Sequence, residues 1–316
     1  MKVVFLGTSE VGLPTLGALA QHHQVVGVLT SPDALVGRKQ VLTPSPIAVR
    51  AQELGLHVLK PEKVRGNSEV LEELEKLGAD IYVVVSYGKI LPKELIDAPP
   101  LKTLNIHFSL LPQYRGAAPI QAALKNGETV TGTTIFVLDE LLDHGPILAQ
   151  VTEPVRPDDT FTTLAGRMAK ISAEKLIEIL PAYQNGALKP KEQNHELATK
   201  APMLKKEDGK IDWSKTAQEI YNQWRAYQPW PGLYTTWNGK LIKMLECRPI
   251  SVPPESPVLL QENETALPGT VLPGGVIACG LGTYLQIVVL QLEGKQATSV
   301  EAYLHGNKSF VGEVLA

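Results

Sequence analysis

The chain has few cysteines and no long apolar run, and each absence excludes a class of protein. Its two cysteines, Cys247 and Cys279, are too few for a disulfide framework and lack the close spacing of metal ligands. No apolar stretch reaches the roughly 18 residues of a membrane-spanning helix, and the N-terminus lacks the cleavage site of a signal peptide. We therefore expect a cytoplasmic protein without a membrane segment, because a reducing compartment suits so few thiols.

An excess of positive charge is also missing. The formal net charge is −3 at pH 7, which gives no general support for nucleic-acid binding, so any RNA contact would need local basic patches. With 44% hydrophobic and 20% charged residues, the composition is that of an ordinary globular protein. A length of 316 residues is enough for two domains.

A complete phosphate-binding loop is absent as well. Gly7 and Gly12 bracket the first strand-to-helix turn, but the dinucleotide fingerprint needs three glycines in that window. A Walker loop needs Lys and then Ser or Thr after its second glycine, where Leu13 and Pro14 stand. The pattern favours a tight turn that glycine permits over nucleotide-dependent chemistry.

Strand and helix patterns alternate through the first part of the chain, which is typical of an α/β fold with a Rossmann-like open twisted sheet. The expected strands are residues 3–6, 25–29, 81–85, 101–107, 129–138 and 147–151. The expected helices are residues 11–20, 47–54, 69–77, 118–124 and a long amphipathic helix at 160–180.

The pattern changes after a polar, lysine-rich stretch that predicts a linker. Beyond it, Thr216 and Glu219 have the spacing of a capping box, and Ile220, Trp224 and Tyr227 would form the buried stripe of the following helix. Short strands expected at 241–247, 270–272, 275–279 and 284–292 indicate a small OB-like β-barrel. The predicted parts are an α/β domain at 1–186, a linker at 187–209 and the barrel domain at 210–316.

Polar side chains gather at the end of the predicted strand 101–107. Because side chains alternate along a strand, Asn105, His107 and Ser109 are expected on one face. In open α/β sheets, ligands bind in the crevice beyond the carboxyl ends of the strands. A carboxylate, Asp143, follows the next pair of strands in a turn that ends at Pro146. The spacing therefore predicts a polar site at this edge of the sheet.

These residue types suit acyl transfer without a covalent intermediate. Neutral imidazole can accept the proton of an attacking amine, and a carboxylate can hold that imidazole in place. An Asn amide can donate to the oxyanion, and one such donor contributes on the order of 3 kcal/mol to the barrier. Ser109 lies outside any nucleophile elbow, so a supporting hydrogen bond is its expected role. From residue types alone, a half-buried His107 with satisfied hydrogen bonds and a turn-forming Asp143 remain the alternative interpretation.

The same segment carries a family resemblance. Residues Asn105-Ile-His107-Phe-Ser109-Leu-Leu-Pro112, continued by Gln-Tyr-Arg115-Gly-Ala-Ala-Pro-Ile-Gln, resemble the signature of the 10-formyltetrahydrofolate-dependent formyltransferases, specifically of those that act on methionyl initiator tRNA. Further agreement occurs at residues 3–8, 43–46, 84–92, 210–213 and 229–232. The resemblance therefore extends over essentially the whole chain.

The resemblance implies a formyltransferase that moves the formyl group of 10-formyltetrahydrofolate to the amino group of methionyl initiator tRNA. Asn105, His107 and Asp143 match the family's oxyanion donor, base and orienting carboxylate. The expected contacts of the folate co-substrate are Tyr87, Gly88, Ile90, Leu91, Pro92, Ser109, Leu110, Leu111, Pro112, Asp139 and Leu142. We expect a monomer, and ligand spacing indicates no metal requirement.

RNA contacts are expected in both domains. The resemblance places a tRNA-contacting loop at residues 31–46, in which Arg38 and Lys39 carry the positive charge. The part from residue 210 onward has 8 Lys and Arg against 9 Asp and Glu, so binding there needs a local basic strip. The candidates are Lys205, Lys206, Lys210, Lys240, Lys243 and Arg248, and the alternative for each is an ordinary solvated side chain. For Trp213, Trp224, Trp230 and Trp237, we favour packing over base stacking.

Two departures from the family pattern bear on these expectations. Residues 141–145 read Leu-Leu-Asp-His-Gly where the family usually has Gly-Leu-Asp-Thr-Gly, which predicts an altered loop beside the folate. Residues 33–40 are less basic and less glycine-rich than usual, so Arg38 and Lys39 would make the phosphate contacts.

Two other functions compete with this prediction. A formyltransferase for an amino sugar nucleotide or another small amine would lack the tRNA loop and the module around Trp213, and both are present. A catalytically silent tRNA-binding protein would have lost the polar trio, and its three positions are filled.

Overall fold

The computed structural model describes residues 1–37, 40–251 and 266–316. These residues form two compact units. The first unit comprises residues 1–119, 130–154 and 163–202, and the second comprises residues 120–129, 155–162 and 203–316.

The first unit is built on a seven-stranded sheet in the order β5-β2-β1-β6-β7-β8-β9. Its strands are β1 (Lys2–Gly7), β2 (Gln24–Leu29), β5 (Val58–Leu59), β6 (Ile81–Val85), β7 (Thr103–His107), β8 (Val130–Val137) and β9 (Ile147–Pro154). Neighbours from β5 to β7 run parallel, whereas β8 and β9 pair antiparallel. The alternating α/β pattern of the sequence thus gives the predicted open sheet, extended by an antiparallel edge.

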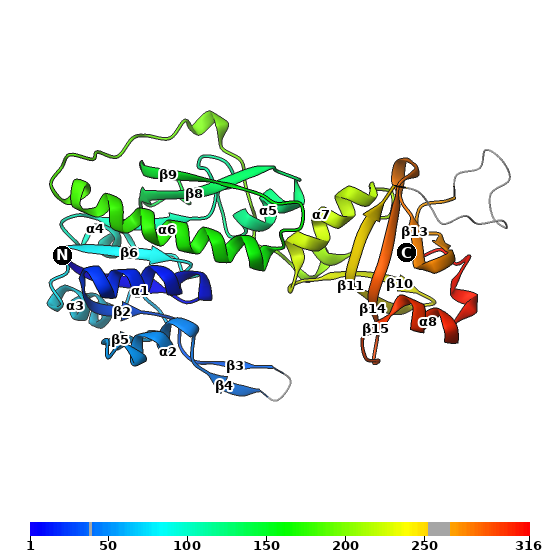
Figure 1. Ribbon diagram of the computed structural model, residues 1–316. Helices are drawn as coiled ribbons and strands as arrows, with labels where there is room; N and C mark the ends of the chain where they lie inside the picture. Colours follow the sequence, from blue (N-terminus) through cyan, green and yellow to red (C-terminus); the bar gives the residue numbers. More distant parts are fainter. Residues whose placement is uncertain (38–39, 252–265) are drawn as a thin grey trace. The chain divides into compact units, whose positions relative to one another are not determined.

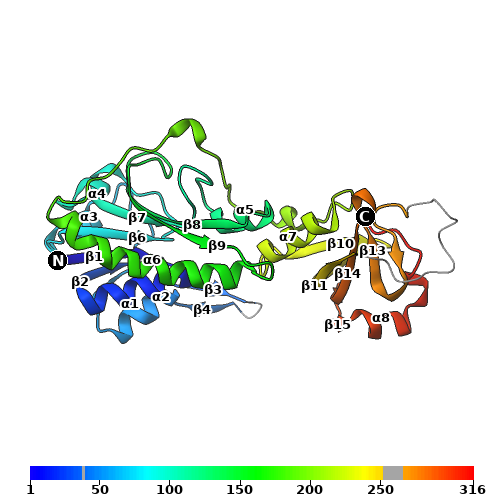
Figure 2. The same cartoon turned by 45° about the horizontal axis from the view of Figure 1, so that its top comes forward.

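Helices cover both faces of this sheet (Figures 1 and 2). They are α1 (Leu13–His22), α2 (Pro46–Glu53), α3 (Ser68–Lys76), α4 (Lys93–Asp97) and α6 (Phe161–Gln184), whereas α5 (Pro119–Lys125) belongs almost entirely to the second unit. The central strands β1 and β6 are almost entirely buried, as expected of parallel strands that lie between helices. Val4 and Leu6 pack with Leu74 of α3 and Leu95 of α4 in a hydrophobic core.

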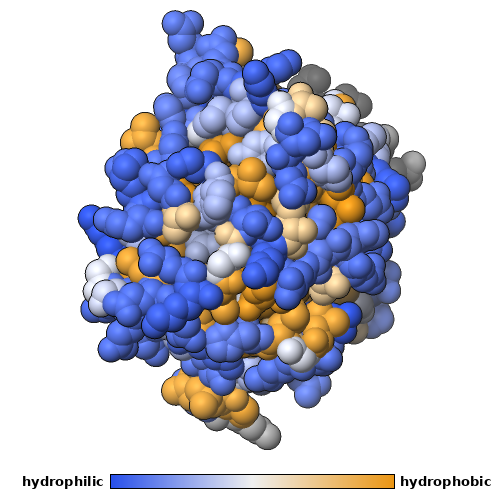
Figure 3. Space-filling view, turned by 90° about the vertical axis from the view of Figure 1, so that its left-hand side faces the viewer, coloured by the Kyte–Doolittle hydropathy of each residue, from blue (hydrophilic) through white to orange (hydrophobic). Residues whose placement is uncertain are grey.

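A β-hairpin that the sequence did not reveal projects from the first unit. Its strands are β3 (Ala34–Val36) and β4 (Val41–Thr43), and it forms the apolar lower tip in Figure 3. Its exposed apolar side chains are Leu35, Val36, Val41 and Leu42. The predicted tRNA contacts Arg38 and Lys39 lie outside the described residues.

Much of the segment that the sequence predicted as a linker is paired with the first unit. Lys191 and Ile147 exchange backbone hydrogen bonds of 2.7 and 2.8 Å. Further along, Arg115 donates to the Thr199 carbonyl and accepts from the Ala201 amide. We call residues 191–201 the strap, because they run along two loops at the carboxyl end of the sheet.

The second unit contains the predicted capped helix. Helix α7 (Ala217–Tyr227) carries the full capping box, in which Thr216 and Glu219 each bond the other's backbone amide. Ile220 and Tyr227 are buried, as the stripe predicted. A second helix, α8 (Val300–Gly306), was not predicted, and Ser299 caps its first turn.

The strands of the second unit form an antiparallel sheet in the order β10-β11-β14-β13-β12, with β15 paired to β14. They are β10 (Leu233–Trp237), β11 (Lys240–Ile250), β12 (Val271–Leu272), β13 (Val276–Ala278), β14 (Tyr284–Leu292) and β15 (Thr298–Ser299). The C-terminal residues join the two edges, since Gly312 and Glu313 bond Val271 while Ala316 bonds Thr236 of β10. The sheet therefore closes into the small barrel that the sequence predicted.

Three of the four tryptophans pack as expected. Trp213 is buried and donates to the Thr235 hydroxyl, and Trp224 donates to the Leu245 carbonyl. Trp237 donates to Glu313 and packs edge-on against Phe310. Trp230 differs, because 56% of its surface is exposed.

None of the helices in residues 1–37, 40–251 and 266–316 has both the length and the apolar character needed to cross a membrane.

Candidate active site

The predicted polar residues lie at the carboxyl ends of neighbouring strands. Strand β7 ends at His107, β6 ends at Val85 beside it, and the loop after β8 carries Asp143. The sheet order reverses direction between β1 and β6, and ligands of open α/β sheets bind near such a point. The edge that the sequence singled out therefore coincides with the place where this architecture forms a binding crevice.

His107 and Asp143 form a buried pair. The exposed fractions are 5% for His107 and 7% for Asp143, and Nδ1 of the imidazole lies 3.6 Å from Oδ2 of the carboxylate. On its other side, Nε2 of His107 lies 2.9 Å from the Tyr114 carbonyl oxygen. Because a carbonyl can only accept, Nε2 carries the proton of the neutral ring. The unprotonated nitrogen of neutral His107 is therefore Nδ1, which faces Asp143.

The environment of His107 favours the neutral ring. Burial lowers the pKa of His107 below its ordinary value of 6.5, and this effect exceeds the opposing effects of Asp143 and the Tyr114 carbonyl. The imidazole is therefore unprotonated near pH 7 and available as a base. Asp143 acts in the opposite direction on the pKa, because its negative charge stabilises the imidazolium form.

Asn105 occupies the same face of β7 as His107, two residues earlier in the strand. Its side chain is half-buried and has no hydrogen-bond partner within residues 1–37, 40–251 and 266–316. An amide whose donors are not used internally can donate to a bound molecule, as an oxyanion requires.

The loop of Asp143 has an unusual backbone. Asp143 adopts a φ of +48°, in the left-handed region that costs a residue with a side chain about 1–3 kcal/mol. In this conformation its Oδ2 accepts a hydrogen bond of 2.7 Å from the Gly116 amide. At Gly145, a Cβ atom would overlap the carbonyl oxygen of Val137. The loop therefore packs against β8 too closely for any other residue at that position.

Residues 109–112 of the predicted signature are held by internal hydrogen bonds. The Ser109 hydroxyl donates to the Gln113 carbonyl at 2.6 Å, and the Ser109 carbonyl accepts from Thr134. The Leu111 amide donates to the same Thr134 hydroxyl, and the Gln150 amide donates to the Leu111 carbonyl. Ser109 thus has the contacts of a supporting residue, and Leu110 and Pro112 are half-buried beside it.

The loop after β6 borders open space. Gly88 has a φ of +79°, Ile90 is 85% exposed, and Leu91 and Pro92 follow it. Ile90, Leu91 and Pro92 line a cavity of about 750 Å³ that Arg65 also borders. Tyr87 differs from its neighbours, because it is 2% exposed and its ring is buried in the core.

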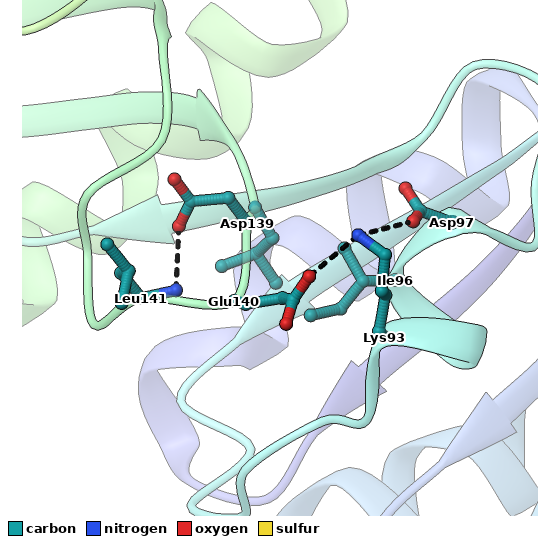
Figure 4. Close-up of a pocket in the computed structure, with 7 residues that line it drawn as sticks. Lys93, Ile96, Asp97, Asp139, Glu140 and Leu141 are labelled. Atoms are coloured by element: carbon teal, nitrogen blue, oxygen red, sulfur yellow. Dashed lines mark hydrogen bonds and ion pairs between the residues drawn. The ribbon is translucent and has the colours of Figure 1, made fainter.

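The loop after β8 closes a smaller cavity of about 240 Å³ (Figure 4). Lys93 lies there between two carboxylates, 2.7 Å from Glu140 and 3.4 Å from Asp97. Asp139 accepts from the Leu141 amide, while Leu141 and Leu142 expose 60% and 70% of their surface. The predicted folate contacts Ile90, Leu91, Pro92, Asp139 and Leu142 thus all come from the two loops that border these cavities.

His144, the departure from the family pattern, is engaged with other residues of the loop and of the strap. Its Nδ1 lies 2.7 Å from Oδ2 of Asp139. Its ring stacks on His195 of the strap, with centroids 4.0 Å apart and planes at 3°. The sequence carries no signal for His195, because this residue stands in a polar segment with no periodic pattern.

Gln193 of the strap was also missed. It is 5% exposed, and its amide donates to the carbonyls of Asp143 and Gly145 while accepting from Arg115. The only sequence signal at this position is an isolated Gln among lysines, which by itself indicates a solvated side chain.

The second unit presents a row of polar side chains. Register pairs Tyr234 of β10 with Lys243 of β11 and Lys243 with Gln291 of β14, while a bridge joins Lys210 to Tyr234. Residues directly opposite in neighbouring strands share a face, so Lys210, Tyr234, Lys243 and Gln291 form one row across the sheet. The predicted contacts Lys205, Lys206, Lys210, Lys240, Lys243 and Arg248 are all exposed.

Comparison with protein families gives a match in each part of the chain. The family described as formyl transferase matches residues 1–180, and the formyl transferase C-terminal domain matches residues 203–308. A methionyl-tRNA formyltransferase of Acidobacterium capsulatum is 42% identical over 312 residues, covering 97% of both chains. That of Bacillus subtilis is 39% identical over 319 residues, covering 99% of this chain and 97% of its own.

Solved structures share the fold at low identity. An N-formyltransferase from Helicobacter canadensis, solved with folinic acid and dTDP-3-aminofucose, aligns with a TM-score of 0.64 and 19% identity. The alignment covers 90% of this chain and 98% of that chain. HypX from Aquifex aeolicus, solved with tetrahydrofolic acid, aligns with a TM-score of 0.61 and 18% identity over 99% of this chain and 48% of its own.

Proposed function

The chain belongs to the formyl transferase family and its co-substrate is 10-formyltetrahydrofolate, and on that premise we propose that it formylates the α-amino group of methionyl initiator tRNA. The product would be the N-formylmethionyl-tRNA that begins translation in the cytoplasm, and the enzyme would act as a monomer. The single observation that carries this substrate is the full-length similarity, at about 40% identity, to proteins named methionyl-tRNA formyltransferase.

The chemistry proposed is direct acyl transfer. The neutral amino group of methionine attacks the formyl carbon of the donor, so that a C–N bond forms and the formyl oxygen becomes an oxyanion. The half-buried Asn105, whose amide has no described internal partner, is suited to donate a hydrogen bond to this oxyanion.

His107 would carry the proton between the two nitrogens. Its depressed pKa keeps it neutral before the attack, and its free nitrogen Nδ1 accepts the proton that the amine loses. The resulting imidazolium lies against Asp143, whose charge stabilises it. When the intermediate collapses, the bond to N10 of the folate breaks and His107 returns the proton to that nitrogen, leaving tetrahydrofolate.

The folate would occupy the crevice between the loops that follow β6 and β8. Ile90, Leu91 and Leu142 present apolar surface there, which suits a flat heterocycle. Gly88, with its positive φ, lets the backbone approach a ligand without an intervening side chain. Backbone groups of these loops would hold the pterin ring, with Tyr87 contributing only its main chain.

The tRNA would meet the exposed row of the second unit. Lys210 and Lys243 flank Tyr234, so that two cations and an aromatic ring lie on one face of the sheet. Lys205, Lys206 and Arg248 add exposed positive charge in the same unit. Arg38 and Lys39, outside the described residues, would serve as the corresponding contacts of the first unit.

The test is formylation of methionyl initiator tRNA beside methionyl elongator tRNA, with 10-formyltetrahydrofolate as donor. Strong preference for the initiator is the expected result. Transfer to an amino sugar nucleotide with none to either tRNA would keep the acyl-transfer centre and overturn the substrate.

A further inference from the structure

The strap, residues 191–201, contacts the loop that follows His107 after β7 and the loop after β8 that carries Asp143. On one side, Lys191 pairs with Ile147 just beyond the Asp143 loop. On the other, the Tyr114 amide donates to the Thr199 hydroxyl at 2.8 Å, next to the carbonyl that holds His107. Midway between these contacts, the strap turns the buried side chain of Gln193 toward the Asp143 loop.

Three hydrogen bonds determine the orientation of the Gln193 amide. Nε2 donates to the carbonyl of Asp143 at 3.0 Å and to the carbonyl of Gly145 at 2.8 Å, and Oε1 accepts from Nη2 of Arg115 at 2.7 Å. Carbonyls only accept and a guanidinium only donates, so the amide can take no other orientation. At 5% exposure, Gln193 has no surface to offer a substrate.

These bonds complete a closed ring around Asp143. Its carboxylate accepts from the Gly116 amide, the preceding Arg115 side chain bonds Gln193, and Gln193 bonds the Asp143 carbonyl. Asp143 needs such support, because its left-handed backbone is unfavourable for a residue with a side chain. The ring thus ties both the main chain and the carboxylate of Asp143 to the two residues that follow Tyr114.

The ring of His144 stacks on the ring of His195, which gives the Asp143 loop a second contact with the strap. Nη2 of Arg115 lies 2.8 Å from Nδ1 of His195, and the guanidinium can only donate. The Arg115 side chain therefore bonds the strap at two residues, Gln193 and the more exposed His195.

We propose that Gln193 is a positioning residue for formyl transfer, which holds the Asp143 carboxylate against the imidazole of His107. The inference rests on the proposed function, in which Asp143 stabilises the protonated form of His107. Loss of the Gln193 amide removes two hydrogen bonds from a strained loop, so the carboxylate moves away from the imidazole. Folate and tRNA binding are unaffected, because the buried side chain touches neither.

Two substitutions separate the contacts of Gln193. Gln193→Met keeps the length of the side chain and removes all three hydrogen bonds. Gln193→Glu keeps an acceptor for Arg115. It replaces the amide nitrogen by a carboxylate oxygen, which cannot donate to the carbonyls of Asp143 and Gly145. Both variants are expected to lower kcat about tenfold or more while KM for folate and tRNA changes less than about twofold.

The decisive measurement is a double-mutant cycle with Asp143→Asn, which removes the charge and keeps a residue that tolerates a positive φ. If Gln193 acts through the Asp143 carboxylate, Gln193→Met lowers kcat in the wild type but has little further effect beside Asp143→Asn. An equal loss in both backgrounds, or a loss seen only in KM, overturns the inference.

Tyr183→Phe is the matched control, because it removes a 2.9 Å hydrogen bond to the Leu101 carbonyl at the opposite end of β7. Melting temperatures of all variants show whether stability falls by comparable amounts. A loss of kcat in Tyr183→Phe similar to that in Gln193→Met would mean that general loosening explains both. A wild type that formylates an amino sugar nucleotide and no methionyl-tRNA would refute the proposed substrate, and the same cycle would then be measured with that acceptor.

Discussion

The imidazole of His107 at the end of β7 and the carboxylate of Asp143 in the loop after β8 come from different elements, yet Nδ1 and Oδ2 lie 3.6 Å apart with both residues more than nine-tenths buried. Burial and the carboxylate act on the imidazole in opposite directions. Burial lowers the pKa of His107 and keeps the ring ready to accept a proton, while Asp143 stabilises the ring once the proton has arrived. These are the properties that the base proposed for formyl transfer needs, because it must be unprotonated before the amine attacks.

The first prediction concerns the pH dependence of formyl transfer. Only neutral His107 can act as a base, so kcat/KM should rise with pH through a pKa below the ordinary 6.5 and then level off. Because the charge of Asp143 raises that pKa, Asp143→Asn should move the acid limb to lower pH as well as lower the plateau. The profile is measured by initial rates from pH 5 to 8, and a limb that moves to higher pH would contradict the assigned electrostatics.

Replacing the imidazole tests the base itself. His107→Ala should lower kcat by about two or more powers of ten, because the attacking amine loses its proton acceptor. Folate binding, measured by fluorescence quenching or calorimetry, should remain close to that of the wild type. Near wild-type turnover in this variant would remove His107 from the role of base.

The Asn105 amide should contribute to the rate and little to binding. Asn105→Ala removes a donor directed at a charge that develops only in the transition state, so kcat should fall about a hundredfold with KM nearly constant. Asn105→Asp keeps the size of the side chain and replaces the donor by an acceptor, so it should be at least as impaired. A variant whose loss lies in KM for folate would make Asn105 a binding residue instead.

Much of this site was predictable because a strand has a period of two. The alternation in β7 places Asn105 and His107 on one face of the sheet. This holds although β7 pairs antiparallel with β8, because side chains alternate in both kinds of sheet. Gln193 and His195 could not be predicted in this way. They reach the site through the pairing of an irregular segment with loops distant in sequence, and irregular segments carry no periodic signal.

In the fold as well, elements with a local sequence signal were predictable and elements without one were not. Helix α7 was predictable, because Thr216 and Glu219 have the spacing of a capping box at its N-terminus. The long α6 was predictable from the helical spacing of its apolar residues. The hairpin β3–β4 was not, because its apolar side chains are exposed and follow no burial pattern. The closure of the barrel depends on backbone bonds of the last residues to Val271 and Thr236, which no side-chain pattern encodes.

The cationic row of the second unit should act on tRNA affinity alone. Lys210→Ala and Lys243→Ala should each raise KM for tRNA several-fold. Each should also make the slope of log affinity against log salt concentration shallower by about one, because one phosphate contact is lost. Neither should change the chemical step measured at saturating tRNA. Lys308→Ala is the control, because Lys308 is equally exposed but lies outside the row. Equal effects of all three variants would indicate non-specific attraction rather than a contact surface.

Two glycines offer a paired test of the Asp143 loop. At Gly145 a Cβ atom would overlap the Val137 carbonyl, so Gly145→Ala must push the loop away from β8. The carbonyls of Asp143 and Gly145 both bond Gln193, so this shift displaces the carboxylate proposed to orient His107, and kcat should fall about a hundredfold. Gly166, within α6, has open space around its Cβ position. Gly166→Ala should therefore leave kcat unchanged and stabilise the protein by about 0.5–1 kcal/mol in urea unfolding, because alanine favours a helix. Full activity of Gly145→Ala would show that the reaction tolerates a displaced Asp143, and the orienting role of that carboxylate would then be wrong.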